Sequence, residues 1–423
     1  MTVADGFTYI DRELHCGDVR VTDIVRETGT PLYLYNLDAV LDRYEQHRAA
    51  FASFSHRTCF AVKANTALPL LQVLAAAGCG FDVNSRGELF RAMKAGADPR
   101  RITMTGVGKS RADIAAALDA GVALLNVESA SECRLVSDVA EERGAVADVL
   151  LRLNPDVETD THPYISTGEA AHKFGLSPGD IRSLAAQAAW LPGLRIAGLS
   201  MHLGSQILSP LPYAHGLHVM LKVLDDITPL LDRAPDIIDI GGGFGVRYDV
   251  CHGELDPIKV AAVMADVLGD RDDPWTLITE PGRSLVANAG VLVTAVEHVK
   301  PSEDRTFLIL DAGMNDLLRP ALYQASHSIV PVRESEADVQ LYDIVGPVCE
   351  SSDTFAVNYA LPSQERGDLV ALLSAGAYGA SMASTYNSRP LAAEAVVYKG
   401  EWHLARERQS LEDMIRGEFP LSL

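Results

Sequence analysis

Residues 58–84 read TCFAVKANTALPLLQVLAAAGCGFDVN and hold, in order, a strand-like apolar run, a helical stretch and a second strand-like run. The first run, 58–63, ends at Lys63, and the second, 79–84, carries Asp82. The stretch between them is rich in alanine and leucine and closes on a glycine, a common helix C-cap. This order predicts a βαβ unit with parallel strands.

The same alternation continues along the chain. Eight β-prone runs precede residue 282, at 58–63, 79–84, 102–106, 124–128, 148–153, 196–203, 237–241 and 276–280. Eight repeats within about 250 residues fit a TIM (β/α)8 barrel better than an open doubly wound sheet. A Rossmann-type sheet is the alternative, but the GxGxxG motif expected after its first strand is missing.

The pattern of the sequence changes after residue 290. Short β-like runs separated by turn residues follow, at 291–299, 306–312, 328–332, 341–346, 369–376, 393–400 and 401–407. They predict a mostly antiparallel β-domain, which the short strands expected at 7–14 and 31–36 can join. Because 423 residues exceed one comfortable hydrophobic core, we expect two domains: a barrel over 36–285, and a β-domain formed by 1–35 and 286–423.

The composition of the chain argues against some classes of binding partner. The net charge of −21 argues against nucleic acid or an anionic membrane, since phosphate would repel so acidic a chain. The N-terminal MTVADGFTYIDREL shows no secretory signal, and no apolar run approaches the roughly 18 residues of a membrane span. The six cysteines lack metal-like spacing, so we expect free thiols, no metal site and a cytoplasmic location.

Chemically capable side chains gather at the ends of the predicted strands. Lys63 ends the first strand and Asp82 lies at the end of the second, while His202 and Ser205 follow the sixth. The seventh strand runs into a glycine cluster, GGGFG at 241–245, and the eighth ends in EPGR at 280–283. Because a TIM barrel collects its chemistry at the C-terminal ends of its strands, these residues are predicted to share one face.

Each of these residues also has an ordinary structural interpretation. Lys63 could extend its ammonium to water, Asp82 could cap a helix, and His202 could be a hydrogen-bonded core residue. The glycine cluster could be a tight turn, and Glu280 and Arg283 could form a surface ion pair. For any one of these residues alone, the structural interpretation is the better one. For the whole set on one face of the barrel, the functional interpretation is better.

Together these groups suit a phosphorylated cofactor held as a Schiff base. Pyridoxal phosphate needs an amine for its aldehyde, backbone N–H groups for its phosphate and a carboxylate for its pyridine nitrogen. A histidine ring can stack on the pyridine. We therefore predict that Lys63 is used chemically.

The chain at this point resembles a known family, the diaminopimelate decarboxylases, within the alanine-racemase-like, fold-type III group of pyridoxal-phosphate enzymes. The resemblance runs in order from about residue 30 to 410. The motifs that carry it are FAVKAN, FDVNSRGEL, HPYISTG followed by HKFG, MHLGSQI, DIGGGFG, EPGRS, DAGMNDLLRPALY, VGPVCESSD and GAYGASMASTYNSRP. The implied fold is a TIM barrel with a C-terminal β-domain.

The resemblance implies roles for individual residues. Lys63 would bind the cofactor aldehyde, His202 would stack on its ring, and Glu280 would pair with the pyridinium nitrogen. The other residues expected around the cofactor are Asp82, Ser205, Gly242, Gly243, Gly282, Arg283 and Tyr378.

The resemblance also implies a substrate site and a homodimer. Arg283, Arg319 and Tyr323 would hold the carboxylate that the substrate retains, with Tyr378 nearby. Cys349 and Glu350 would come from the second subunit, Glu350 facing the distal ammonium and Cys349 acting as a candidate proton donor. The implied reaction is decarboxylation of meso-2,6-diaminopimelate to L-lysine, the last step of lysine biosynthesis.

Alternative functions differ in their sequence requirements. A paralogous decarboxylase of ornithine, carrier-bound glutamate or carboxynorspermidine would share the core chemistry. An amino-acid racemase would place an arginine at the pyridine nitrogen, which Glu280 disfavours, and a non-catalytic regulatory relative would be expected to lose the lysine, the phosphate loop or the cysteine. Arg86 and Met201 depart from the family pattern at positions without an assigned role, and the polar stretch 156–172 is either a loop over the site or an ordinary surface loop.

Overall fold

The computed structural model describes residues 2–157, 173–249, 253–269, 271 and 273–421. Nearly all of the predicted loop at 156–172 lies outside these residues. The chain divides into two compact units. The barrel unit comprises Leu41–Val246 and Gly253–Leu285, and the β unit comprises Met1–Val40, Arg247–His252 and Val286–Leu423.

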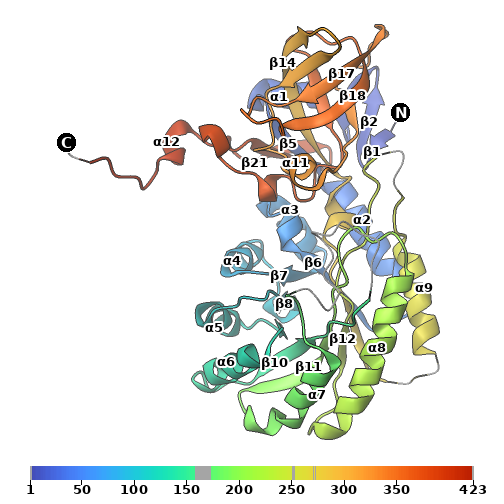
Figure 1. Cartoon of the computed structure of the whole chain (residues 1–423), viewed down its shortest axis with the longest axis vertical. Helices are drawn as coiled ribbons and strands as arrows, with labels where there is room; N and C mark the ends of the chain where they lie inside the picture. Colours follow the sequence, from blue (N-terminus) through green and yellow to red (C-terminus); the bar gives the residue numbers. More distant parts are fainter. Residues whose placement is uncertain (1, 158–172, 250–252, 270, 272, 422–423) are drawn as a thin grey trace. The chain divides into compact units, whose positions relative to one another are not determined.

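The barrel unit contains a closed barrel of eight parallel strands, which confirms the predicted TIM barrel (Figure 1). The order around the barrel is β10, β11, β12, β13, β6, β7, β8, β9. Their bounds are β6 His56–Ala61, β7 Gly80–Val83, β8 Ile102–Met104, β9 Leu124–Val127, β10 Ala147–Arg152, β11 Leu194–Ser200, β12 Ile237–Asp239 and β13 Thr276–Thr279. Each strand coincides with one of the eight predicted runs.

Helices follow the strands, and several begin at a serine that caps them. Ser85, Ser110, Ser129 and Ser177 each accept a hydrogen bond from the backbone N–H three residues later. Such caps satisfy an otherwise unpaired helix donor and mark where each βα loop ends. The helices are α2 Leu37–Ala50, α3 Leu68–Ala76, α4 Arg86–Lys94, α5 Arg111–Ala120, α6 Ala130–Glu141, α7 Pro178–Ala186, α8 Leu211–Ile227, α9 Pro257–Leu268 and α10 Arg283–Val286.

The interior of the barrel is partly apolar and partly polar. Five buried residues from strands form an apolar cluster: Cys59, Leu124, Leu150, Ala197 and Ile278. All eight barrel strands also carry a fully or nearly fully buried polar side chain, namely Thr58, Asp82, Thr103, Asn126, Arg152, Ser200, Asp239 and Thr279. Because buried polar groups are costly unless paired, such a concentration indicates a site.

The β unit is built on a nine-stranded sheet. Its main path runs β18, β17, β15, β14, β5, β20, β21, with β19 pairing β14 and β16. The bounds are β5 Leu32–Asn36, β14 Gly290–Pro301, β15 Thr306–Leu310, β16 Ile329–Pro331, β17 Val339–Val345, β18 Thr354–Pro362, β19 Leu369–Leu372, β20 Ala393–Tyr398 and β21 Glu401–Arg406. Of these nine strands, only β18 was not predicted from the sequence. The pairs β15–β17 and β20–β5 are parallel, and the other pairs of the sheet are antiparallel.

The N-terminal strands join the β unit, as the sequence predicts. β5 lies between β14 and β20 in the sheet. A small four-stranded sheet precedes it, with bounds β1 Thr2–Ala4, β2 Phe7–Ile10, β3 Glu13–Cys16 and β4 Val19–Arg20. Phe7, Leu14, Leu34 and Val291 share one apolar core, so the N-terminal segment is packed into this unit.

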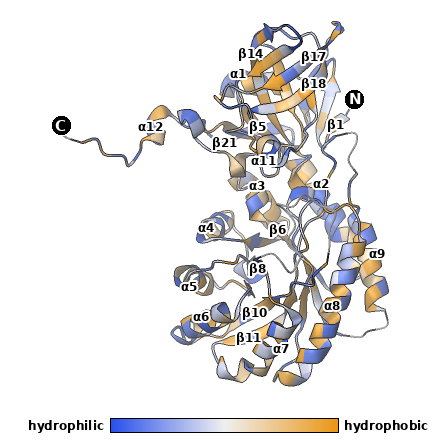
Figure 2. Cartoon of the chain, viewed as in Figure 1, coloured by the Kyte–Doolittle hydropathy of each residue, from blue (hydrophilic) through white to orange (hydrophobic). Residues whose placement is uncertain are grey.

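Three short helices complete the β unit: α1 Val21–Thr28, α11 Arg319–Tyr323 and α12 Leu411–Met414. Figure 2 shows orange and blue residues mixed along the helices, as expected for amphipathic elements. Among the residues that the structure describes, no helix is both long and apolar enough to cross a bilayer.

Candidate active site

The predicted site residues fall into two sets, one in each unit. The barrel unit holds Lys63, Asp82, His202, Ser205, Gly242, Gly243, Glu280, Gly282 and Arg283, and the β unit holds Arg319, Tyr323, Cys349, Glu350 and Tyr378. Within the barrel unit the set lies at the C-terminal ends of the strands, where the chemistry of this fold collects.

Lys63 lies just beyond its strand and not on it. β6 ends at Ala61, and Val62–Ala64 form a 3-10 turn that the Asn65 N–H closes by donating to the Val62 carbonyl. The predicted strand 58–63 is therefore displaced by two residues toward the C-terminus. The turn leaves the Lys63 side chain 37% exposed and its Nζ 3.3 Å from Oδ2 of Asp82, whose side chain is fully buried.

Asp82 is a buried carboxylate whose capacity to accept hydrogen bonds is only partly used. Its Oδ2 accepts from Lys63 Nζ and from Nδ2 of Asn84, each at 3.3 Å. Its Oδ1 has no hydrogen-bond partner among the described residues. A buried oxygen without a donor is costly in an otherwise packed interior, which points to a ligand group at this place.

Glu280 and Asp239 form a coupled pair of buried carboxyls. Burial raises the pKa of Glu280 well above its usual range, and the neighbouring Asp239 and Asp82 raise it further. Burial also raises the pKa of Asp239, to about 7, although the Gly241 N–H donates to it. Glu280 Oε1 has no partner among the described residues. This arrangement holds a proton between two carboxyls, with one oxygen open to a further donor or acceptor.

The Asp239 carboxyl gives the cofactor-free protein a definite pH dependence. An Asp in an unfolded chain titrates near ~3.9, whereas Asp239 in the folded protein titrates at about 7. The stability that this group contributes is therefore complete below about pH 4 and is lost as the pH rises through about 7. Asp239→Asn does not titrate, so between about pH 5 and pH 8 its free energy of unfolding should fall less than that of the wild type. Urea denaturation at both pH values measures this, and equal changes in the two proteins would contradict the assignment.

His202 is held as a neutral ring. The Gly242 N–H donates to Nδ1 at 3.3 Å, so Nδ1 is bare and Nε2 carries the proton. Burial lowers the pKa of His202 well below its usual range, and the positive charges of Lys63 and Arg152 lower it further. A neutral aromatic ring suits stacking against another ring.

The glycine turn after β12 leaves no room for side chains. A Cβ built at Gly242 would lie 2.2 Å from the backbone oxygen of Glu280, and one at Gly243 would lie 2.5 Å from that of Gly204. Gly243 also has a φ of 97°, which favours glycine. Beside this turn, Nη2 of Arg283 donates to Oγ of Ser205 at 2.9 Å. Bare backbone N–H groups next to a hydroxyl and a guanidinium can cradle a phosphate.

Gly242→Ala should weaken cofactor binding without changing any ionisable group. Its methyl would meet backbone, which cannot move aside as a side chain can, so the turn must shift. We expect the affinity for pyridoxal phosphate to fall by at least about tenfold, the equivalent of about 1.4 kcal/mol. Fluorescence titration of the cofactor measures it. Gly108→Ala is the matched control, because a Cβ there meets nothing within 4 Å, and an equal loss in both variants would contradict the role of the turn.

The sequence analysis missed several buried ionic residues of the barrel unit. Arg152 Nη1 lies 2.9 Å from Oε1 of Glu128, and Lys109 Nζ lies 2.8 Å from Oε1 of Glu132. All four are at least nine-tenths buried. The available signal was the arginine at the end of the apolar run 148–153, and the aspartate before GGGFG was a similar signal for Asp239.

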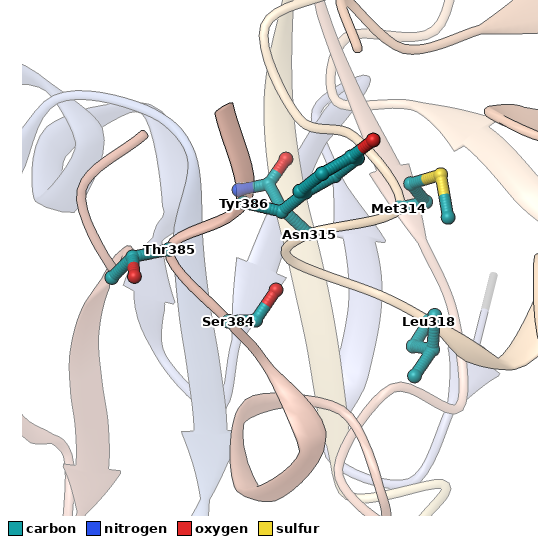
Figure 3. Close-up of a pocket in the computed structure, with 6 residues that line it drawn as sticks. All are labelled: Met314, Asn315, Leu318, Ser384, Thr385 and Tyr386. Carbon is teal, nitrogen blue, oxygen red and sulfur yellow. The ribbon is translucent and has the colours of Figure 1, made fainter. Parts of the chain in front are cut away.

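In the β unit, Cys349 and Glu350 are exposed neighbours. The Cys349 N–H donates to Oδ1 of Asn387 at 3.3 Å, and the Tyr386 hydroxyl donates to Oε1 of Glu350. Tyr386 also lines a hollow of about 440 Å³ (Figure 3). The other lining residues are Met314, Asn315, Leu318, Ser384 and Thr385. Glu350 meets this hollow through Tyr386, and its own side chain lines a separate hollow of about 500 Å³.

Arg319, Tyr323 and Tyr378 lie elsewhere in the β unit. Arg319 begins α11 and is buried, and Tyr323 ends the same helix. Tyr378 sits in the GAYG turn with a φ of 56°. Such a backbone conformation in a large residue costs free energy and is often found at functional sites.

Comparison with known proteins agrees with this geometry. Residues 37–287 match the family described as "Pyridoxal-dependent decarboxylase, pyridoxal binding domain". The chain is 44% identical over 418 residues to the diaminopimelate decarboxylase of Pseudomonas aeruginosa, covering 98% of this chain and 99% of that one.

Two solved structures are also similar over most of the chain. The diaminopimelate decarboxylase of Helicobacter pylori complexed with L-lysine is 38% identical, with a TM-score of 0.89 over 93% of this chain and 98% of that one. The M. jannaschii enzyme in co-complex with L-lysine is 31% identical, with a TM-score of 0.94 over 100% and 99%. The chain therefore belongs to the diaminopimelate decarboxylase family of pyridoxal-dependent decarboxylases.

Proposed function

We propose that this protein is a carboxy-lyase that converts meso-2,6-diaminopimelate to L-lysine and carbon dioxide, the last step of lysine biosynthesis. The observation that carries the proposal is the barrel-end arrangement of Lys63, Asp82 and Glu280 around a glycine turn, in a chain whose full-length relatives are named for this activity. The M. jannaschii and H. pylori enzymes are each described in complex with L-lysine, the expected product.

The residues present fit pyridoxal phosphate as the cofactor. Lys63 offers a partly exposed amine, the turn at Gly242 and Gly243 has no side chains and leaves room for none, and Glu280 offers an open buried oxygen. When bound, the cofactor supplies an electron sink for the carbanion left by loss of carbon dioxide. Asp82, Ser205, Gly282, Arg283 and Tyr378 complete the proposed cofactor site.

Each barrel residue would have a defined task. Lys63 would hold the cofactor through Nζ, and the Asp82 carboxylate 3.3 Å away would orient that amine. Glu280, paired with Asp239, would hold the proton that the pyridine nitrogen of the cofactor needs. His202 would offer a neutral imidazole face to the cofactor ring and so add no competing charge. Proton transfer within a buried pair needs no water, which suits a closed site.

The β unit would recognise the substrate. Arg319, Tyr323 and Tyr378 of that unit, with Arg283 of the barrel unit, are proposed to hold the retained carboxylate, since guanidinium groups bind carboxylates in bidentate geometry. In domain terms, 36–285 would bind the cofactor, and 1–35 with 286–423 would form the β-domain.

We further propose a homodimer with shared active sites, in which Glu350 binds the distal ammonium and Cys349 protonates the substrate carbon. Both side chains are exposed in the single chain, as groups that complete a partner's site would be. Mixing inactive Lys63→Ala and Cys349→Ala proteins under subunit exchange tests this. Random pairing gives one intact site in half the dimers, so about a quarter of wild-type activity should return. No recovery would indicate that each site is built from one chain.

A cytoplasmic location is also proposed. Cys16, Cys59, Cys79, Cys133 and Cys349 are all free thiols in the structure, and Cys349 is exposed. A reducing compartment maintains thiols in this state.

A parallel substrate assay tests the proposed reaction. The protein loaded with pyridoxal phosphate would be offered meso-diaminopimelate, ornithine and lysine, and carbon dioxide and the amine product would be measured. We expect lysine from meso-diaminopimelate and no comparable release from the others. Preferential turnover of ornithine would assign the chain to a paralogous activity, and no turnover despite bound cofactor would indicate a carrier-bound substrate or a regulatory protein.

A further inference from the structure

We propose that His327 is a positioning residue that fixes the guanidinium of Arg319 for the substrate carboxylate. The inference rests on the proposed function, because it takes Arg319 as the carboxylate ligand. His327 touches neither cofactor nor substrate in this account and acts only through Arg319.

The contacts of Arg319 define the plane of its guanidinium. Nη1 lies 2.7 Å from Nε2 of His327, and the guanidinium carbon lies 4.0 Å from the centre of the Tyr248 ring. His327 packs edge-on against the same Tyr248 ring, with centroids 5.1 Å apart and planes at 73°. Arg319 and His327 are 6% and 3% exposed. One edge and one face of the guanidinium are therefore set by protein groups.

The hydrogen bonds of His327 allow one protonation state. Its Nδ1 lies 2.8 Å from the backbone oxygen of Leu373, which can only accept, so Nδ1 carries the proton. Arg319 can only donate, so Nε2 must be bare. His327 is thus neutral with the proton on Nδ1, and a second proton would oppose the Arg319 N–H. The imidazole therefore links the backbone oxygen of Leu373 to the guanidinium at the end of the long Arg319 side chain.

The backbone around His327 is held in place by hydrogen bonds. The Leu373 N–H donates to the Ser328 carbonyl at 2.8 Å, and the Ser328 N–H donates to the Tyr248 carbonyl at 3.2 Å. By contrast, α11 has only five residues, and so short a helix does little to orient a long side chain. His327 and Tyr248 therefore both contribute to the orientation of Arg319.

Recognition of a carboxylate depends on that orientation. A guanidinium pairs with a carboxylate through two parallel N–H groups, and losing the alignment costs affinity even when the charge remains. Removing His327 should consequently weaken binding of ligands that carry the retained carboxylate. Ligands with the same amines but no carboxylate charge should be little affected.

The test uses binding of L-lysine and L-lysinamide to the cofactor-loaded protein, measured by calorimetry. We expect His327→Leu to weaken L-lysine binding about 10- to 100-fold, the range for a lost hydrogen bond to a charged group, with L-lysinamide and pyridoxal phosphate binding unchanged. His327→Gln keeps one acceptor and one donor on a planar group and should restore most of the affinity. His298→Gln, at an exposed histidine of β14 in the same unit, is the matched control.

The outcomes separate this inference from the proposed function. If wild-type protein does not bind L-lysine, or Arg319→Ala leaves its affinity unchanged, the proposed substrate site is wrong. If Arg319→Ala weakens L-lysine binding but His327→Leu does not, the positioning role is wrong. Equal weakening of L-lysine and L-lysinamide by His327→Leu, without rescue by His327→Gln, would mean general damage and would also overturn it.

Discussion

Lys63→Ala abolishes decarboxylation in our account, with a fall in turnover on the order of 10³-fold or more. The reason is that the variant lacks the amine at the barrel end through which the cofactor is held and released. Carbon dioxide release from meso-diaminopimelate at saturating pyridoxal phosphate measures the loss. The substitution also removes the ionic partner of the buried Asp82 carboxylate, so the variant should be checked for cooperative unfolding.

Lys222→Ala is the matched control for this prediction. Lys222 is an exposed lysine on α8 of the same unit, so its removal should leave turnover within about twofold of the wild type. Substantial turnover by folded Lys63→Ala protein would show that the amine is not required. The Asp82–Lys63 ion pair would then be a structural contact only.

Glu280→Gln should lower turnover by about 10²- to 10³-fold while leaving cofactor binding largely intact. The wild-type carboxyl can give its proton to the pyridine nitrogen and then stabilise the positive charge. A glutamine amide is neutral and can do neither, so the electron sink weakens. Turnover, together with a separate titration of pyridoxal phosphate, distinguishes loss of chemistry from loss of binding.

Glu45→Gln serves as the control for Glu280→Gln. Glu45 forms an exposed ion pair with Arg48 on α2, of a kind that contributes little to stability. A Glu280→Gln protein with normal turnover would contradict the role assigned to the carboxyl. Loss of turnover in proportion to lost cofactor would instead make Glu280 a binding group.

The fold was largely predictable because its signal is repeated. Each barrel strand is a short apolar run, several of the helices that follow begin with a cap or end on glycine, and eight such units leave few alternatives. β18 was missed because only Phe355 and Leu361 of Thr354–Pro362 are buried and an asparagine lies within it at a positive φ, so the apolar alternation of a strand is weak. Strand ends were predicted less accurately, since the local 3-10 turn at Val62–Ala64 continues the apolar run without any residue that marks the end of the strand.

The candidate site was predictable only where sequence motifs carry it. Lys63, His202 and Glu280 follow strands directly, so topology alone brings them to one end. Asp239 was missed because a carboxyl inside a strand gains its role from a neighbour 41 residues later in the sequence. His327 was missed for a similar reason, because its function depends on two hydrogen bonds that no spacing reveals.

The measurement that tests the central claim most directly is reductive trapping of the cofactor. The protein loaded with pyridoxal phosphate would be treated with borohydride, which fixes the link between cofactor and amine, and then digested and analysed by mass spectrometry. We expect the label on the peptide containing Lys63, without activity or a substrate being involved. A label on another lysine, or none at saturating cofactor, would contradict the assignment of Lys63 and the mechanism built on it.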